Sequence, residues 1–289
     1  MISIIISSYQ PKYYFALEKN IAETVGVPYE IIKIENPGLM GIAEAYNKGA
    51  KKARFENLLF LHEDVLFHTQ NWGEKLIKHL EDMTTGIVGV AGSDYVPTAP
   101  SGWNVGNNSH HFINIIQSFG TENPIQERLS MNCVKSVLAL DGVFLAMRKD
   151  VFQQFHFNEK LKGFHSYDLD ISLQVALTMK NYVINDVLIE HFSKGTFNCE
   201  WFQNNIQVRK HLGSNFNEKK IPAIEFHTFL SFLDTYLKYN SVSTTNILRS
   251  LRYFPFGHLS LNHYYQIGKK IYYYLYYQIS YNQKYQNKS

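Results

Sequence analysis

The chain has 289 residues, of which 45% are hydrophobic and 18% charged, enough apolar sequence for one large domain with or without an accessory part. The formal net charge is +3, so bulk charge gives no sign of nucleic acid as a partner. No stretch reaches the roughly 20 apolar residues that cross a bilayer, and the apolar start lacks the basic region of a signal peptide, so we expect a cytoplasmic protein.

The first half of the chain alternates short β-rich runs with helical patterns, which is typical of an α/β fold whose mostly parallel sheet is flanked by helices. Residues 2–7 form a continuous apolar run of the buried-strand type. Such a sheet collects ligands at the carboxyl ends of its strands. The further elements expected here are a helix at 11–25, a strand at 31–34, a helix at 41–54, a strand at 58–61, a helix at 72–80 and a strand at 87–91.

The second half begins with a long predicted loop at residues 92–132, rich in Gly, Pro, Ser, Asn and His, and a loop of this length is usually functional or disordered. Beyond residue 214 the composition changes to aromatic and basic helical patterns. We therefore expect a catalytic or binding domain at 1–214 and a helical C-terminal extension at 215–289. The elements expected between the loop and the extension are a strand at 143–147, helices at 150–155 and 168–180, and a strand at 183–189.

Four acidic or histidine features stand at or near the ends of predicted elements: Glu35, the run His62-Glu63-Asp64, Asp168 and His191. Carboxylates at a strand end can hold a hard divalent cation, and imidazole suits manganese better than magnesium. A carboxylate at a helix start can act as a general base. Each feature also has a structural reading: a solvated turn, a charged loop opening, a helix cap or a packed histidine.

The order of these features resembles the family-two-type glycosyltransferases of the GT-A fold, over about residues 2–197. The most specific parts are Leu59-Phe60-Leu61-His62-Glu63-Asp64, which resembles the metal-binding Asp-x-Asp strand end, and Tyr167-Asp168-Leu169-Asp170, which resembles the Glu-Asp helix that carries the base. The other matching stretches are Ser3-Ile4-Ile5-Ile6-Ser7-Ser8-Tyr9, Asn36-Pro37-Gly38, Ala45-Tyr46-Asn47-Lys48-Gly49 and Asp141-Gly142-Val143-Phe144.

This resemblance implies an inverting transfer of a sugar from a nucleotide diphosphate, most simply a UDP-sugar, to a carbohydrate or lipid-linked acceptor in surface polysaccharide or lipooligosaccharide synthesis. It implies Asp168 as the base, and Asp64 and His191 as ligands of Mn²⁺ or Mg²⁺. The residues that it implies for donor binding are Ser7, Ser8, Tyr9, Glu35, Asn36, Asn47, Glu63, Asp141 and Gly142.

Two departures from the family pattern stand at these motifs: His62 replaces the first Asp of Asp-x-Asp, and Tyr167 replaces the Glu before the base. The His-x-Asp form resembles a prokaryotic subgroup of these transferases. The alternatives are a non-catalytic nucleotide-sugar-binding protein of the same fold, a nucleotidyltransferase and a metallohydrolase. Ser8-Tyr9-Gln10-Pro11 lacks the Gly-rich phosphate loop expected of the nucleotidyltransferase, and no His-Glu-x-x-His motif supports the metallohydrolase.

The long loop and the tail each leave two readings open. In the loop, the rings of Trp103, His110 and His111 could stack on sugars or pack within the protein. In the tail, the aromatic and basic runs at 253–256 and 269–274 could lie on an anionic membrane surface, which would make the protein peripheral at the inner membrane face, or pack on the catalytic domain.

Overall fold

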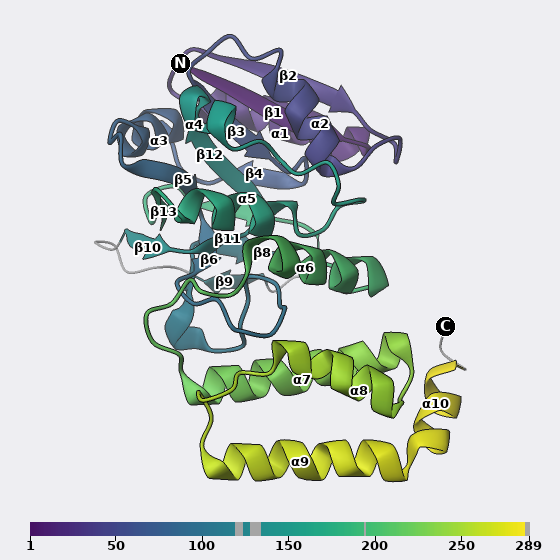
Figure 1. The fold of residues 1–289 in the computed structure, drawn as a ribbon. Helices are drawn as coiled ribbons and strands as arrows, with labels where there is room; N and C mark the ends of the chain where they lie inside the picture. The colour runs from purple at the N-terminus through teal and green to yellow at the C-terminus, as the bar shows by residue number, and fades with distance from the viewer. Residues whose placement is uncertain (119–123, 128–133, 194, 287–289) are drawn as a thin grey trace.

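The computed structural model describes residues 1–118, 124–127, 134–193 and 195–286, and its α/β body lies above a layer of C-terminal helices (Figure 1). The central sheet has seven strands in the order β10-β13-β5-β12-β3-β1-β2. β1 pairs in parallel with β2 and β3, and β13 with β5, whereas β10 and β12 run antiparallel. The predicted α/β fold with a mainly parallel sheet is therefore confirmed. Its strands are β1 (Ile2–Ser8), β2 (Tyr29–Glu35), β3 (Asn57–Leu61), β5 (Thr85–Gly89), β10 (Lys135–Val137), β12 (Phe144–Arg148) and β13 (Lys180–Val183).

Helices cover both faces of this sheet, because successive strand residues point to opposite faces and both sets are apolar. Within β1, Ile4 and Ile6 enter one buried cluster with α1 (Pro11–Thr24) and α3 (Trp72–Leu80), whereas Ile5 enters a second cluster. The second cluster is completed by α2 (Ile42–Ala50), α4 (Lys149–Gln154) and α5 (Tyr167–Ala176).

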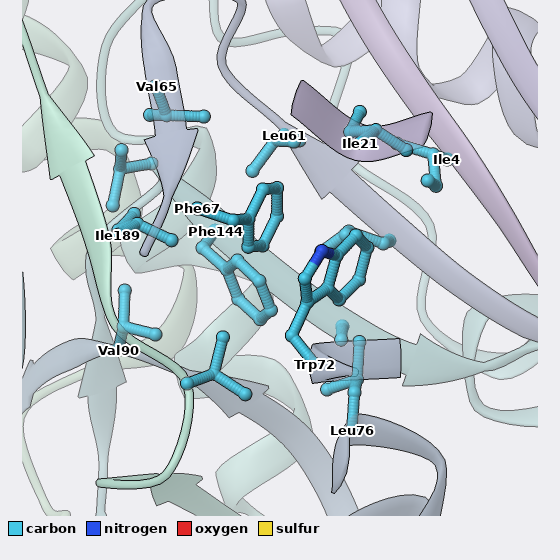
Figure 2. Close-up of a cluster of buried hydrophobic side chains, with 14 of the residues drawn as sticks. Ile4, Ile21, Leu61, Val65, Phe67, Trp72, Leu76, Val90, Phe144 and Ile189 are labelled. Carbon is cyan, nitrogen blue, oxygen red and sulfur yellow. The ribbon is translucent and has the colours of Figure 1, made fainter. Parts of the chain in front are cut away.

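The first cluster supports the strands that carry the candidate site (Figure 2). The rings of Phe67 and Trp72 are stacked with centroids 4.0 Å apart, and Trp72 Nε1 donates a hydrogen bond to Thr24 Oγ1 at 3.0 Å. Val65, in β4 (Val65–Phe67), and Ile189, in β14 (Ile189–His191), are buried in the same cluster. Because each is close in sequence to a candidate metal ligand, the core fixes the backbone from which the ligands project.

The long loop predicted at residues 92–132 is observed only in part: residues 94–107 form no helix or strand, whereas short strands occupy other described parts of the segment. β4 and β14 extend into a four-stranded sheet of order β4-β14-β8-β9, and a three-stranded sheet has the order β11-β6-β7. These strands have only two or three residues each, so they show no period in the sequence and form by pairing with distant strands. Residues 119–123 and 128–132 of the predicted loop lie outside the described residues. The remaining bounds are β6 (Ala91–Ser93), β7 (His111–Ile113), β8 (Ile115–Gln117), β9 (Ile125–Glu127) and β11 (Ala139–Leu140), with a 3₁₀ turn at Asn108–His110.

Three further boundaries differ from expectation. The helix predicted at 168–180 ends at Ala176, and the strand predicted at 183–189 is two strands, β13 and β14, separated by a turn that contains Asn185 and Asp186. The polar pair interrupts the apolar run, as turn residues do. The helix predicted at 41–54 ends at Ala50, and β4 was not predicted because it has only three residues.

The C-terminal helices pack around an apolar cluster that also includes Ala99 of the α/β body and Phe202 and Ile206 of α6. Glu225, at the start of α7, is buried and accepts hydrogen bonds from Tyr95 Oη at 2.7 Å and from the Thr98 backbone, so the extension is tied to the α/β body. We propose that the division between the parts falls near residue 214, between α6 and α7. Within the described chain, no helix has the length and apolarity of a membrane span. The helices are α6 (Cys199–Leu212), α7 (Pro222–Asn240), α8 (Thr244–Ser250), α9 (Leu261–Tyr276) and α10 (Gln278–Gln286), with a 3₁₀ turn at Leu251–Tyr253.

Candidate active site

Three potential metal ligands converge beyond the carboxyl end of β3. One ligand atom from each of His62, Asp64 and His191 lies within 4.8 Å of the others. Asp64 Oδ1 is 3.9 Å from His62 Nδ1, and Asp64 Oδ2 is 3.6 Å from His191 Nε2. The strand register explains the convergence, since antiparallel pairing of β4 with β14 places Val65 opposite His191 and so brings His191 beside Asp64. The predicted pair Asp64 and His191 is therefore joined by His62.

The hydrogen bonds of Gln117 define the orientation of the His191 ring. Gln117 Nε2 donates to the carbonyl oxygens of His191 at 2.9 Å and Ser193 at 2.8 Å, which turns Gln117 Oε1 toward His191 Nδ1 at 3.2 Å. An amide oxygen only accepts, so Nδ1 carries a proton, and in the neutral form of the ring Nε2 has its lone pair on the side of Asp64. The Ser193 hydroxyl also lies 3.2 Å from this Nε2.

The His62 ring is oriented in the same way by Tyr167. Tyr167 Oη donates to the Gly142 carbonyl at 3.1 Å and lies 2.7 Å from His62 Nε2. Because the single hydroxyl proton is engaged with Gly142, His62 Nε2 donates to Oη, and Nδ1 is left without a proton on the side of Asp64. Burial lowers the pKa of His62, with His191 adding to the effect and Asp64 opposing it. A neutral imidazole is the form that binds a metal.

The two imidazoles and one carboxylate fit a divalent transition-metal ion. Each ring presents an unprotonated nitrogen to the carboxylate and is held by a hydrogen bond at its other nitrogen, the usual arrangement of metal-binding histidines. This donor set suits manganese better than magnesium, which prefers oxygen ligands.

Asp168 lies on the other side of Gly142, in the first turn of α5. Its Oδ2 accepts a hydrogen bond from the Gly142 backbone N–H at 3.0 Å. Burial, followed by the negative charge of Asp141, raises the pKa of the Asp168 carboxyl to about 7. A carboxylate with a pKa near neutrality is well suited to take a proton from a hydroxyl.

Gly142 joins the three-ligand cluster to Asp168. Its carbonyl oxygen accepts from Tyr167, and its N–H donates to Asp168. A Cβ atom at this position would lie 2.1 Å from Tyr167 Oη, so the site requires glycine. Asp141 accepts hydrogen bonds from Trp103 Nε1 at 2.7 Å and from the Val143 N–H at 2.8 Å, which hold its carboxylate beside the glycine.

A second group of predicted residues lies where β1 and β2 end. Ser8 pairs with Glu35 in the parallel register. Glu63, predicted to bind donor, is buried and accepts hydrogen bonds from the backbone N–H groups of Tyr9 at 3.1 Å and Gln10 at 2.9 Å. Its carboxylate therefore fixes the turn between β1 and α1, while the Tyr9 side chain stays exposed.

The remaining predicted donor residues differ in how they are engaged. Glu35 is exposed and pairs with Lys33 at 2.6 Å. The buried Asn36 donates to Ser7 Oγ at 3.2 Å and bonds the backbone of Met40 on both sides of its amide, so it closes the turn after β2.

Asn47 lies apart from the other predicted residues. It is buried in α2, and its amide exchanges hydrogen bonds with the backbone of Phe157 and with Glu159. These contacts hold the loop before α5 against α2. We therefore expect Asn47 to position this loop rather than to touch a ligand.

Sequence reasoning did not identify Gln117 or the role of Tyr167. Gln117 lies in the segment predicted as loop, where no motif marks it. Of the loop rings, Trp103 bonds to Asp141, His110 pairs with Asp94 at 2.6 Å and His111 accepts from the Val105 N–H at 2.8 Å. All three rings are thus used within the protein.

The sequence matches the family described as "Glycosyltransferase like family" over residues 3–219. No curated protein matches the chain by sequence.

Solved structures with the same fold are distant in sequence. GalNAc-T7 with UDP, GalNAc and Mn²⁺ is 12% identical, with a TM-score of 0.54 over 86% of this chain and 53% of that chain. The chain thus spans about half the length of GalNAc-T7. S. aureus TarS 1–349 in complex with UDP-GlcNAc is 12% identical, with a TM-score of 0.54 over 88% of this chain and 81% of that chain. The same TarS segment with UDP has 12% identity and a TM-score of 0.51, covering 88% and 79%. These similarities confirm the predicted GT-A fold.

Proposed function

The chain belongs to the glycosyltransferase-like family, and from this premise we propose that it is a metal-dependent, inverting glycosyltransferase. It would move a sugar from a nucleotide diphosphate to an acceptor hydroxyl. The observation that carries the proposal is that Gly142 links the two functional groups. Its carbonyl accepts a hydrogen bond from Tyr167, which contacts His62 of the three-ligand cluster, and its N–H donates to Asp168.

The proposed metal residues are Asp64, His191 and His62. A divalent ion held there would act as a Lewis acid and stabilise the negative charge of the departing nucleotide diphosphate. Tyr167 and Gln117 would keep both imidazoles turned toward the ion through their hydrogen bonds.

The proposed base is Asp168. Its carboxylate would take the proton of the acceptor hydroxyl as the oxygen bonds to the anomeric carbon and the bond from that carbon to the diphosphate oxygen breaks. A base placed opposite the leaving group gives one displacement and inverts the anomeric centre. The raised pKa of Asp168 supports this role, because it makes the carboxylate a stronger base than an ordinary aspartate.

The proposed donor is a UDP-sugar. Support comes from structures of the same fold that contain UDP or UDP-GlcNAc. The ends of β1 and β2 would frame the nucleoside through Ser7, Ser8, Tyr9, Glu35 and Asn36, with Asp141 and Gly142 on the sugar side.

We propose a carbohydrate or lipid-linked acceptor in surface polysaccharide or lipooligosaccharide synthesis, with the enzyme at the cytoplasmic face of the membrane. The second candidate is a non-catalytic nucleotide-sugar-binding protein of the same fold. This candidate is supported by the replacement of the family's Asp and Glu by His62 and Tyr167.

The test is calorimetric binding of a panel of nucleotide sugars with Mn²⁺, Mg²⁺ or chelator, together with release of the nucleotide diphosphate. Metal-dependent binding of one donor and slow release of its nucleotide would support the transferase. Asp64→Ala should weaken the metal-dependent binding, whereas Asp168→Asn should leave it intact. Binding of a donor without turnover in the presence of acceptor extracts would favour the second candidate. Failure of every donor to bind a folded protein would contradict both the transferase and the non-catalytic binding protein.

A further inference from the structure

α9 is the outermost helix of the C-terminal extension, with α7 and α8 lying between it and the α/β body (Figure 1). One face of α9 packs against the other helices of the extension. Ile267 and Tyr274 are buried in its apolar cluster, and Asp234 of α7 accepts hydrogen bonds from Lys270 Nζ at 2.6 Å and Tyr274 Oη at 2.7 Å. These contacts set the rotation of α9 and so decide which residues face outward.

The outward face of α9 is aromatic and apolar. Leu261, Tyr265, Tyr272 and Tyr276 are exposed by 89%, 68%, 60% and 67%. Their spacing of four, seven and four residues places them on one side of the helix. Ile279, exposed by 75% in α10, adds a further apolar side chain beyond the end of α9.

The charged side chains of the extension beyond Asp234 are all basic. No Asp or Glu follows Asp234 in the sequence, and Asp234 is itself engaged by Lys270. Lys269 is exposed on α9, and Lys284 is exposed on α10. The basic residues beyond Asp234 are Lys238, Arg249, Arg252, Lys269, Lys270, Lys284 and Lys288.

We infer that the outer face of α9 binds an anionic lipid surface. Tyrosine rings favour the boundary between headgroups and acyl chains, where an apolar ring and a polar hydroxyl are both satisfied. Lys269 and Lys284, exposed on α9 and α10, would complement anionic headgroups. A second copy of the chain fits this face less well, because it would bring two like-charged surfaces together.

This inference deepens the proposed function, because it names the surface at which the enzyme would meet a lipid-linked acceptor. It rests on the proposed function only in saying what membrane binding would be used for. Attraction of the extension to an anionic bilayer is a property of α9 and its neighbours. It is measured without donor, metal or acceptor, so the two proposals fail separately.

The experiment is cosedimentation of the full chain with vesicles of phosphatidylcholine alone or mixed with phosphatidylglycerol. Binding is expected only to the mixed vesicles and should weaken as salt rises. The combined change Tyr265→Ser, Tyr272→Ser and Tyr276→Ser should reduce the bound fraction at least about tenfold, and Lys269→Glu should reduce it less. The matched control is Met83→Ser with Leu177→Ser, which removes exposed apolar side chains of the α/β body and should leave binding unchanged.

Two outcomes would overturn the inference. One is a lack of binding to the mixed vesicles at low salt by a folded protein, whether or not it binds a nucleotide sugar in calorimetry. The other is a lipid-free dimer in analytical ultracentrifugation that the three tyrosine changes abolish, which would assign the face to a second copy. Vesicle binding by a protein that binds no nucleotide sugar would support the inference and count against the proposed transferase.

Discussion

Tyr167 Oη lies 2.7 Å from His62 Nε2, so the two positions at which the chain departs from the family pattern are in direct contact. Where the family pattern has an Asp and a Glu, this chain has an imidazole and a phenol. The phenol gives the imidazole an acceptor for its Nε2 proton and so leaves Nδ1 for the proposed metal. The two exchanges therefore form one unit, and this favours an altered metal site over a decayed one.

Tyr167→Phe tests this unit. The change removes the acceptor of His62 and keeps the buried ring, so the affinity for Mn²⁺ should fall about tenfold or more while the fold persists. Calorimetric titration of Mn²⁺ measures the effect. In a His62→Ala background the same change should have little effect, because the interaction is already lost. Equal effects in both backgrounds would contradict the coupling. Tyr29→Phe, at the opposite end of the sheet, serves as the control.

Gln117 is expected to act on His191 as Tyr167 acts on His62. Gln117→Leu removes the acceptor of the His191 Nδ1 proton, so the Mn²⁺ affinity should fall by about tenfold. Gln117→Glu keeps an acceptor but loses the donations to the His191 and Ser193 carbonyls, so its affinity should lie between those of the wild type and the leucine variant. Similar losses in both variants would point to disturbance of β8 and not to orientation of the ring.

Much of the fold followed from the sequence where elements are long or strongly patterned. The continuous apolar runs at β1 and β3 and the helical spacing in α1 and α3 gave bounds within about two residues of those observed. The small sheets built from β4, β6 to β9, β11 and β14 did not follow, because strands of two or three residues carry no period. They are stabilised by pairing across the chain, as between Val65 and His191.

The residues of the candidate site could be predicted where they stand at the ends of strands or helices. They could not be predicted where their position depends on the pairing of strands that are distant in sequence. Asp64, Asp168 and His191 stand at such ends, and family resemblance singled them out. Gln117 reaches His191 only because β8 pairs with β14, and no pattern in the sequence predicts this strand pairing. Burial also decides roles: Glu63 and Asn47 match their motifs, yet both are engaged with neighbouring backbone.

Asp168→Asn should slow transfer about 10²- to 10⁴-fold, because the amide cannot take the acceptor proton. Donor affinity should change little, since the amide oxygen still accepts from the Gly142 N–H. Rates under saturating donor and calorimetric affinities separate these effects. A variant that retains transfer would remove Asp168 from the role of base. The amide should also raise the melting temperature at pH 8, because it abolishes the cost of ionising a half-buried carboxyl whose pKa is about 7.

The rate of transfer should rise with pH through about 7, because the Asp168 carboxyl must lose its proton to act and its pKa is about 7. Below that pH the group is protonated and transfer stops; above it the rate reaches a plateau. Asp141→Asn removes a negative charge that helps raise this pKa, so the rising limb should move to lower pH. Burial, the larger cause, remains, so the shift is partial. Trp103→Phe keeps the Asp141 charge and should leave the limb in place.

Gly142→Ala should damage both halves of the site in one step. The added methyl group would lie 2.1 Å from Tyr167 Oη, so the phenol must move away from His62, and the backbone that donates to Asp168 must shift. Overpacking of this kind costs about 1–3 kcal/mol of stability. Calorimetry should show weaker Mn²⁺ binding, and transfer should fall further than in Tyr167→Phe, because the base is displaced as well. Gly268→Ala is the matched control: its Cβ meets open space in α9, and alanine there should be neutral or stabilising by about 0.5–1 kcal/mol. Wild-type metal affinity and rate in Gly142→Ala would show that the glycine does not link the two groups.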